Sequence, residues 1–143
     1  MCTFYLGDKM NKYMKLAFKE AQKSLLTDDV PVGAIIVENG KVIAKAHNTK
    51  EKTKLVTRHA EINVVEKACK KKQNWYLNDC EMYVTLEPCK MCQGAIEQAR
   101  IKKVFFAAPR SKENISKSTF KKMEEGLEES QTLLKKFFEN KRK

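Results

Sequence analysis

Glycine and proline are scarce in this chain of 143 residues, which contains 5 of the first and 3 of the second. Their scarcity excludes collagen-like, low-complexity and linker-dominated sequences. No apolar run approaches the ~18 residues that a membrane-spanning helix needs, and residues 1–9 lack the basic start and apolar stretch of a secretory signal. We therefore expect one domain over residues 1–143, in the cytoplasm and with no membrane partner.

Acidic residues are in the minority, with 18 Asp and Glu against 29 Lys and Arg, so the formal net charge is +11. This surplus favours an anionic partner, either nucleic acid or an acidic membrane surface, although a basic proteome or simple solubility accounts for it equally well. The charge is uneven, because residues 47–73 carry net +5 and residues 101–143 net +6, while residues 74–100 carry net −2. Two basic segments therefore flank a slightly acidic one.

The number of cysteines is odd, since the chain contains 5 of them. Without a secretory signal, this count argues against a disulfide framework. Cys89 and Cys92 have the spacing of a metal-binding or redox pair. The remaining cysteines are expected to be free thiols, namely Cys2, Cys69 and Cys80.

Hydrophobic periodicity predicts alternating strands and helices. Strands are expected over residues 32–37, 41–46, 81–86, 103–107 and 120–123, and helices over residues 10–26, 59–72, 89–100 and 126–140. Asn39-Gly40 predicts a tight hairpin, and Ile62, Val65 and Cys69 form the expected apolar stripe of the second helix. Lysines 70–72 fit either the end of that helix or an RNA contact. The order of elements predicts an α/β layered fold with a mixed sheet, the first pair antiparallel and the later strands parallel.

Two short segments together predict a metal site. His59-Ala60-Glu61 and Pro88-Cys89-Lys90-Met91-Cys92 each stand where a helix is expected to begin. One imidazole and two thiolates suit zinc, and the chain has neither a second Cys-x-x-Cys nor any histidine besides His47. Three protein ligands with one open position are typical of catalytic zinc, because the open position holds a water whose pKa the metal lowers.

Helix geometry supports this assignment. Cys89 and Cys92 are spaced i and i+3, so both thiolates face the same way from a first turn, where the helix dipole favours anions. Glu61 can reach the same cavity from the start of its helix, and a carboxylate that does not ligate the metal is placed to move protons. A thioredoxin-like pair normally has proline inside the motif, whereas Pro88 precedes it here. The combination is typical of zinc-dependent nucleobase deaminases.

The sequence resembles the bacterial tRNA-specific adenosine deaminases of the cytidine deaminase-like superfamily. The similarity extends from about Met10 to Ala107, with a weaker match at residues 125–127 and 137–138. Four segments carry it, namely Val30-Pro31-Val32-Gly33-Ala34, Ala46-His47-Asn48, His59-Ala60-Glu61-Ile62, and residues 83–92 (Tyr-Val-Thr-Leu-Glu-Pro-Cys-Lys-Met-Cys). The resemblance implies a three-layer α/β/α cytidine deaminase-like fold with a mixed central sheet of about five strands. Residues 1–143 would then form a single zinc-dependent deaminase domain.

The resemblance also implies the site and the reaction. One Zn²⁺ per chain would be held by His59, Cys89 and Cys92, with Glu61 as the catalytic proton shuttle. Substrate-binding positions are expected at Asn48, Pro31, Val32 and Ala60. The implied reaction is hydrolytic deamination of adenosine to inosine at the wobble position of tRNA, with the anticodon stem-loop as partner and a homodimer as the assembly.

Two departures from the family pattern bear on the substrate. Residues 55–58 are Leu-Val-Thr-Arg, where the family commonly has Asp-Pro-Thr-Ala. We therefore expect Arg58 to place a substrate-binding cation at the pocket rim. The connection over residues 109–119 is short, so part of the surface for tRNA and for the dimer is expected to be altered.

Two other functions remain open from the sequence. One is deamination of a free nucleobase or nucleoside, either guanine or cytosine/cytidine. The other is a catalytically vestigial, zinc-stabilised RNA-binding module, for which Glu61 has no evident use.

Overall fold

A computed structural model describes residues 11–110, 119–123 and 127–141. Five strands form one sheet in the order β2-β1-β3-β4-β5. β1 is antiparallel to both β2 and β3, whereas β3, β4 and β5 run parallel, which confirms the expected mixed sheet. The strands are β1 (Gly33–Glu38), β2 (Lys41–His47), β3 (Cys80–Leu86), β4 (Lys103–Ala108) and β5 (Phe120–Lys122).

The hairpin between β1 and β2 is the one expected from Asn39-Gly40. Both residues have positive φ, 50° and 78°, which is the backbone of a type I′ turn. Glu38 pairs with Lys41 across the turn, so the loop has two residues. Asparagine and glycine adopt this conformation most readily, which explains why this dipeptide fixes the register of the hairpin.

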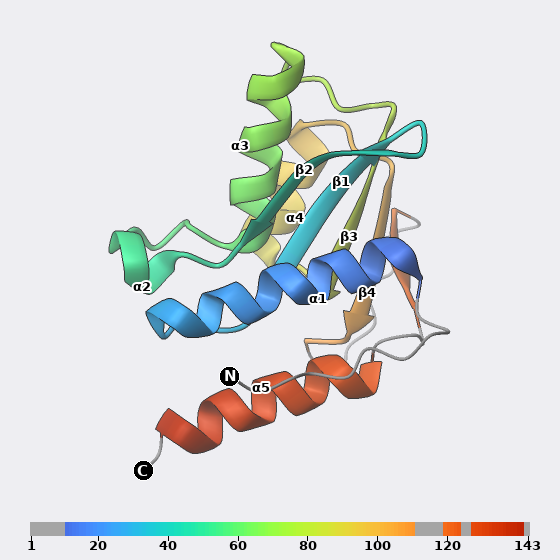
Figure 1. Cartoon of the computed structure of the whole chain (residues 1–143). Helices are drawn as coiled ribbons and strands as arrows, with labels where there is room; N and C mark the ends of the chain where they lie inside the picture. The colour runs from blue at the N-terminus through green and yellow to red at the C-terminus, as the bar shows by residue number, and fades with distance from the viewer. Residues whose placement is uncertain (1–10, 111–118, 124–126, 142–143) are drawn as a thin grey trace.

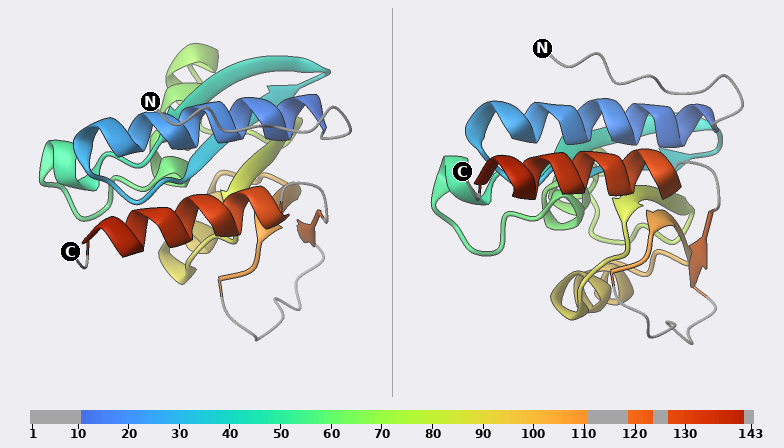
Figure 2. Two further views of the ribbon diagram at one scale, coloured as in Figure 1. Left: turned by 60° about the horizontal axis from the view of Figure 1, so that its bottom comes forward. Right: turned by 90° about the horizontal axis from the view of Figure 1, so that it is seen from below.

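Helices cover both faces of the sheet (Figure 1). α1 (Lys12–Ser24) and α5 (Leu127–Lys141) lie on one face, next to each other in Figure 2, and a 3₁₀ turn, η1 (Leu25–Thr27), follows α1. α3 (Ala60–Lys72) and α4 (Lys90–Gln98) lie on the other face, and the short α2 (Lys50–Thr53) follows β2. The three-layer α/β/α arrangement is thereby confirmed. Within the described residues, no helix is long and apolar enough to cross a membrane.

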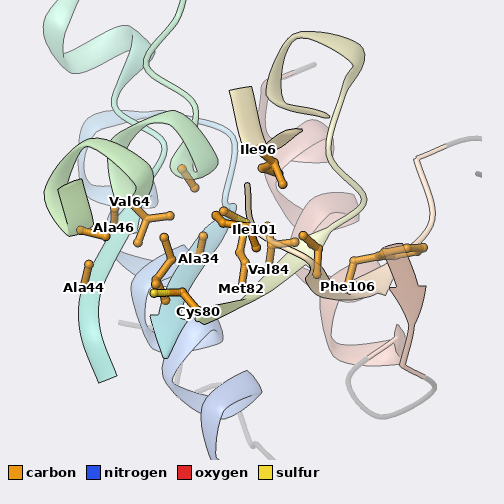
Figure 3. Close-up of a cluster of buried hydrophobic side chains, with 14 of the residues drawn as sticks. Ala34, Ala44, Ala46, Val64, Cys80, Met82, Val84, Ile96, Ile101 and Phe106 are labelled. Atoms are coloured by element: carbon orange, nitrogen blue, oxygen red, sulfur yellow. The ribbon is translucent and has the colours of Figure 1, made fainter. Parts of the chain in front are cut away.

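The core has two parts, one on each face of the sheet. Because side chains alternate along a strand, Ala34 and Ile36 of β1 face α3, whereas Ile35 and Val37 face α1. Figure 3 shows the larger part, which Val64 of α3 and Ile96 of α4 complete, and whose further members include Met82, Val84, Ile101 and Phe106. β1 is therefore buried on both faces, as its unbroken apolar sequence requires.

The buried stripe of α3 differs from the expected one. Ala60, Val64 and Ala68 are fully buried, with a spacing of four residues, whereas Ile62 is only half-buried. Val65 and Cys69 border the stripe and pack partly against the core. The small side chains of Ala60 and Ala68 let α3 lie close to β1 and β2, which explains why this side of the helix, rather than the side with Ile62, is buried.

The helix boundaries also differ slightly from those expected. His59 and Cys89 are the residues before α3 and α4 and have extended backbones, with ψ of 153° and 171°. α4 ends at Gln98 rather than at residue 100, because Arg100 has φ of 66° and cannot continue a right-handed helix. Cys69 and Cys80 are free thiols, as expected. Cys2 and most of the connection over residues 109–119 lie outside the described residues.

Candidate active site

The amino-terminal ends of α3 and α4 meet beside the carboxyl ends of the parallel strands. His59 precedes α3, and Cys89 precedes α4 at the end of β3. Neither side chain caps its own helix. Both are therefore available to point into the space between the two helices, where Cys92 joins them from the first turn of α4.

The three predicted metal ligands form a nearly equilateral triangle. The Nδ1 atom of His59 lies 3.7 Å from Sγ of Cys89 and 3.6 Å from Sγ of Cys92, and the two sulfurs are 3.6 Å apart. A tetrahedral zinc ion with ordinary bond lengths holds two sulfurs about 3.8 Å apart, and a sulfur and a nitrogen about 3.6 Å apart. The distances in this triangle therefore fit a zinc ion. Among the described residues, His59, Cys89 and Cys92 are close enough together to bind one metal ion.

Glu61 lies beside this triangle in the first turn of α3. Its side chain is 1% exposed, and its Oε2 atom has no hydrogen-bond partner among the described residues. Burial raises the pKa of this carboxyl. A buried, unpartnered carboxyl oxygen is costly, so its retention points to a ligand, a metal-associated water or a substrate that completes it.

The electrostatics of the triangle also suit a cation. Burial, together with the neighbouring Glu61 and Cys89, raises the pKa of the Cys92 thiol. A divalent ion would supply the missing charge and hold this sulfur as thiolate. Burial, and then the charges of Arg110 and Lys50, lower the pKa of His59, which keeps the imidazole neutral and able to ligate.

A cavity of about 430 Å³ opens in front of Glu61 and His59. This volume is within the range of small-molecule sites. Its apolar wall comes from the segment before β1, from β3 and from α5, and its polar residues come mainly from loops. The lining consists of Asp28, Asp29, Val30, Val32, Asn48, Lys50, Glu51, His59, Glu61, Leu86, Arg110, Phe137 and Phe138.

Asn48 is held in one orientation at this cavity. Its Oδ1 atom accepts a hydrogen bond of 2.6 Å from the backbone N–H of Ala60, the first residue of α3. Its own backbone N–H donates to the carbonyl of Val32. Because the side-chain oxygen is occupied, the Nδ2 amide remains the group that can donate to a bound molecule.

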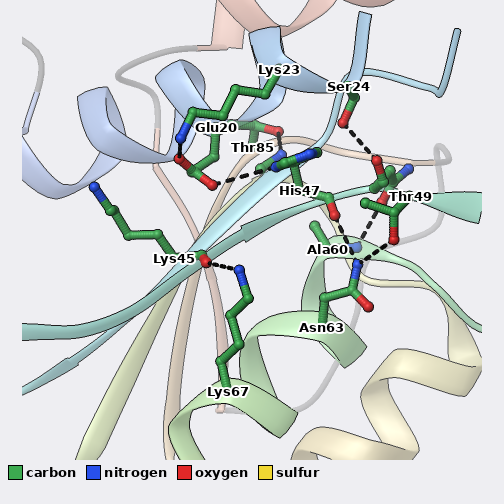
Figure 4. A network of polar contacts seen from close by, with 12 residues as sticks. Glu20, Lys23, Ser24, Lys45, His47, Thr49, Ala60, Asn63, Lys67 and Thr85 are labelled. Carbon is green, nitrogen blue, oxygen red and sulfur yellow. Dashed lines mark hydrogen bonds and ion pairs between the residues drawn. The ribbon is translucent and has the colours of Figure 1, made fainter. Parts of the chain in front are cut away.

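A polar network fixes the start of α3 against the end of β2 (Figure 4). The Nδ2 atom of Asn63 donates to the carbonyl of His47 at 2.9 Å and to Oγ1 of Thr49 at 3.0 Å. Ser24, at the end of α1, donates to the carbonyl of Asn48. These hydrogen bonds join α1, the end of β2 and the start of α3 around Asn48.

The other expected substrate-binding residues lie in different places. Val32 lines the cavity, but Pro31 and Ala60 are buried and do not line it. Arg58 does not line it either, because its guanidinium pairs with Glu66 at 2.9 Å. Arg58, where the family commonly has alanine, therefore pairs with α3 and lies away from the cavity.

Two cations line the cavity, Lys50 and Arg110, and the sequence did not indicate Arg110. It follows β4, two residues beyond Ala108. β3 and β4 are parallel, so their carboxyl ends meet at one edge of the sheet, and loops at such an edge usually form the site. This rule singles out residues 109 and 110 once strand order is known. Phe137 and Phe138 of α5 were noted in the sequence only as a weaker part of the resemblance, yet both line the cavity.

An α/β/α sheet with a His/Cys/Cys triangle at the carboxyl ends of its parallel strands defines the cytidine deaminase-like class, and the solved structures with this fold include deaminases. Within that class, the chain belongs to the MafB19-like deaminase family, whose model matches residues 8–142.

Individual relatives agree with this assignment. A tRNA-specific adenosine deaminase of Aquifex aeolicus is 41% identical over 138 residues, which cover 88% of this chain and 91% of the relative. A structure from studies of A-to-I editing by tRNA:A34 deaminases is 42% identical, with a TM-score of 0.66, over 68% of this chain and 75% of that one. A structure of guanine deaminase from Bacillus subtilis is 40% identical, with a TM-score of 0.66, over 70% of this chain and 66% of that one.

Proposed function

We propose that this chain hydrolyses adenosine to inosine at the wobble position of tRNA, with one zinc ion held by His59, Cys89 and Cys92. The observation that supports this most directly is the unpartnered Oε2 atom of Glu61, buried beside a donor triangle of 3.6–3.7 Å edges. A structural zinc site has no use for such a carboxyl, whereas hydrolytic deamination requires one. The vestigial RNA-binding module therefore lacks support from this geometry.

Bound in the triangle, zinc would act as a Lewis acid and lower the pKa of a water molecule towards ~7. In the overall reaction a C6–O bond forms, the C6–N bond breaks, and ammonia leaves. Glu61 takes the two protons of the water in turn and delivers one to the ring nitrogen and the other to the leaving amino group. Burial favours the protonated form of this carboxyl, so it can both hold and return a proton during the cycle.

Asn48 and the apolar wall orient the base. The fixed oxygen of Asn48 leaves its Nδ2 amide to donate to an acceptor atom of the purine. Val32 and Leu86 offer apolar surface to the ring and exclude water from it. Adenosine in a single-stranded loop enters such a cavity with little unstacking, which suits the anticodon loop of tRNA.

The second candidate is a guanine deaminase, because a structure with that description is 40% identical to this chain. The proposed zinc ligands and proton shuttle of this chain would serve either reaction, so the substrate decides between the two candidates. The net charge of +11 favours RNA over a free base. Turnover of an anticodon stem-loop, adenosine, guanine and cytidine by the zinc-loaded protein, measured as ammonia release, separates the candidates.

The direct test is sequencing of tRNA after incubation with the purified protein. We expect A-to-inosine conversion confined to the wobble position, and none with a Glu61→Ala variant that retains zinc. Ammonia release from guanine with unchanged tRNA would instead establish the second candidate. Salt-dependent tRNA binding with no ammonia from any of these substrates would establish the vestigial module.

We also propose that two copies of this single domain, residues 1–143, assemble as a homodimer in the cytoplasm. Leu55, Val56 and Met91 are 49%, 70% and 39% exposed, and each is within four residues of a proposed zinc ligand. Apolar side chains concentrated around a site favour burial against a partner. Light scattering should give twice the monomer mass, reduced to the monomer mass by Val56→Asp. A reducing compartment keeps the thiolate ligands free for the metal.

A further inference from the structure

Arg110 is fixed to the loop that holds the first sulfur ligand. Its Nε–H donates to the carbonyl of Glu87 at 3.1 Å, and its backbone N–H donates to Oε2 of the same residue at 3.2 Å. The backbone N–H of Glu87 in turn donates to the carbonyl of Ala108. Glu87 is 4% exposed and lies two residues before Cys89, so the guanidinium has a defined position relative to the metal triangle.

The guanidinium also retains most of its binding capacity. It has five N–H donors, and the contact with Glu87 occupies only the one at Nε. No carboxylate of residues 11–110, 119–123 or 127–139 pairs with it. The remaining donors form a planar fork at the cavity rim, and this fork matches a phosphate group.

Two of the carboxylates that line the cavity, those of Asp29 and Glu51, have other partners. Asp29 is buried and accepts from the backbone N–H groups of Glu51 and Lys52, at 2.6 and 3.3 Å. Glu51 pairs with Lys54. These carboxylates are thus bound at α2, which leaves the cation beside Glu87 available to an anionic part of the substrate.

We propose that Arg110 binds a backbone phosphate next to the target nucleotide and thereby makes the site selective for a polynucleotide over a free base. This inference rests on the proposed function and deepens it. A free base or nucleoside offers no anion to the guanidinium, whereas an RNA loop offers one on each side of the extruded nucleotide. Because Arg110 is already held by Glu87, little side-chain entropy is lost when the phosphate binds.

The test is a cycle that combines protein variants with modified RNA. An anticodon stem-loop carries a neutral methylphosphonate on the 5′ or the 3′ side of the wobble adenosine. Binding is measured in the Glu61→Gln background, so that the RNA is not turned over. Arg110→Gln removes the charge, Arg110→Lys retains it, and Lys103→Gln removes an equal charge at the opposite end of β4.

We expect Arg110→Gln to weaken binding of unmodified RNA roughly tenfold to a hundredfold. One methylphosphonate should weaken binding to the Arg110 protein by a similar factor, and should cause no further loss in the Arg110→Gln protein. Arg110→Lys should recover part of the affinity, and Lys103→Gln should stay within about threefold of the parent protein. The slope of log affinity against log salt should fall by about 0.7 in Arg110→Gln.

The proposal is overturned if Arg110→Gln binds as tightly as the parent protein. It is also overturned if the affinity loss caused by Arg110→Gln multiplies with the loss caused by the 5′ methylphosphonate and likewise with the loss caused by the 3′ one. Absence of RNA binding by the parent protein overturns it as well. Inosine formation by the chain without substitutions is measured in parallel and tests the proposed function alone. Inosine formation together with independent losses would therefore retain the function and reject the role of Arg110.

Discussion

Gly33 lies where β1 passes α1, and a side chain there has no space. A Cβ atom added to Gly33 would lie 1.9 Å from the carbonyl oxygen of Ala17 and 2.5 Å from the backbone nitrogen of Ala21. Ordinary contact begins near 3.4 Å, so the helix would have to move away by about 1.5 Å. The atoms in the way are backbone atoms of a helix, which cannot be relieved by a change of rotamer.

The cost of Gly33→Ala follows from what α1 buries. Met14, Ala17 and Phe18 are fully buried against the sheet, and a gap of even 0.5–1 Å forfeits a quarter to a half of a dispersion contact. We expect the free energy of unfolding to fall by about 3–5 kcal/mol, more than ordinary overpacking causes. This is a large part of the 5–15 kcal/mol typical of a domain. Activity should also fall, since Asp28 and Asp29 follow α1 and line the cavity.

Urea denaturation followed by circular dichroism measures this change, with the slope m compared between variants. Gly94→Ala is the matched control, because Gly94 is exposed on α4 and a Cβ there meets nothing within 4 Å. We expect that control to raise the free energy of unfolding by roughly 0.5–1 kcal/mol, since alanine favours a helix interior. A Gly33→Ala protein within about 1 kcal/mol of the parent would refute the close-packing argument.

Three further predictions concern the site and its surroundings. Glu61→Gln should retain zinc by elemental analysis and lose at least about 10²–10⁴-fold in turnover; activity within tenfold of the parent would contradict its role as proton shuttle. Cys89→Ser should lower the zinc content below one per chain, and an unchanged stoichiometry would argue against ligation. Glu20 has its pKa lowered to about 2, chiefly by the hydrogen bond with His47 and also by Lys23, against the effect of burial. Its charged form therefore stabilises the fold by at most about 3 kcal/mol above pH ~4.5, and this contribution is lost as the pH falls towards 2. The difference between parent and Glu20→Gln in urea unfolding should accordingly shrink from about pH 6 to about pH 3, and a constant difference would disprove the pairing.

Local sequence patterns predicted most elements of this fold. Asn39-Gly40 specified its hairpin because few dipeptides accept two positive φ angles. The grouping of His59, Cys89 and Cys92 was also predictable. Their spacing in the sequence and their positions at the starts of two helices are local features. Whether they bind zinc remains a prediction.

Features that depend on the assembled sheet were less accessible. The inward face of α3 depends on how closely Ala60 and Ala68 let it approach β1 and β2, and periodicity alone favoured Ile62. Arg110 became evident only when β4 was paired in parallel with β3, and Arg58 was misplaced because Glu66 lies two turns further along α3. For α3 and for Arg110 the deciding contact joins segments that are distant in the sequence, whereas the pair of Arg58 and Glu66 is a local contact that residue spacing alone did not indicate.

The hydrogen bond from Ala60 to Asn48 limits which residues of this site can be substituted without disturbing the others. The side-chain oxygen of Asn48, which fixes the orientation of its amide at the cavity, also accepts from the first backbone N–H of the helix that begins immediately after His59. A substitution at Asn48 would therefore change the lining of the cavity and also remove a contact that holds the start of α3, next to the proposed ligand His59. Arg110 is bonded to Glu87 instead, so exchange of its side chain changes the rim of the cavity without removing the hydrogen bond at the start of α3. Substrate preference is consequently easier to change by substitution of Arg110 at the rim of the cavity than by substitution of Asn48.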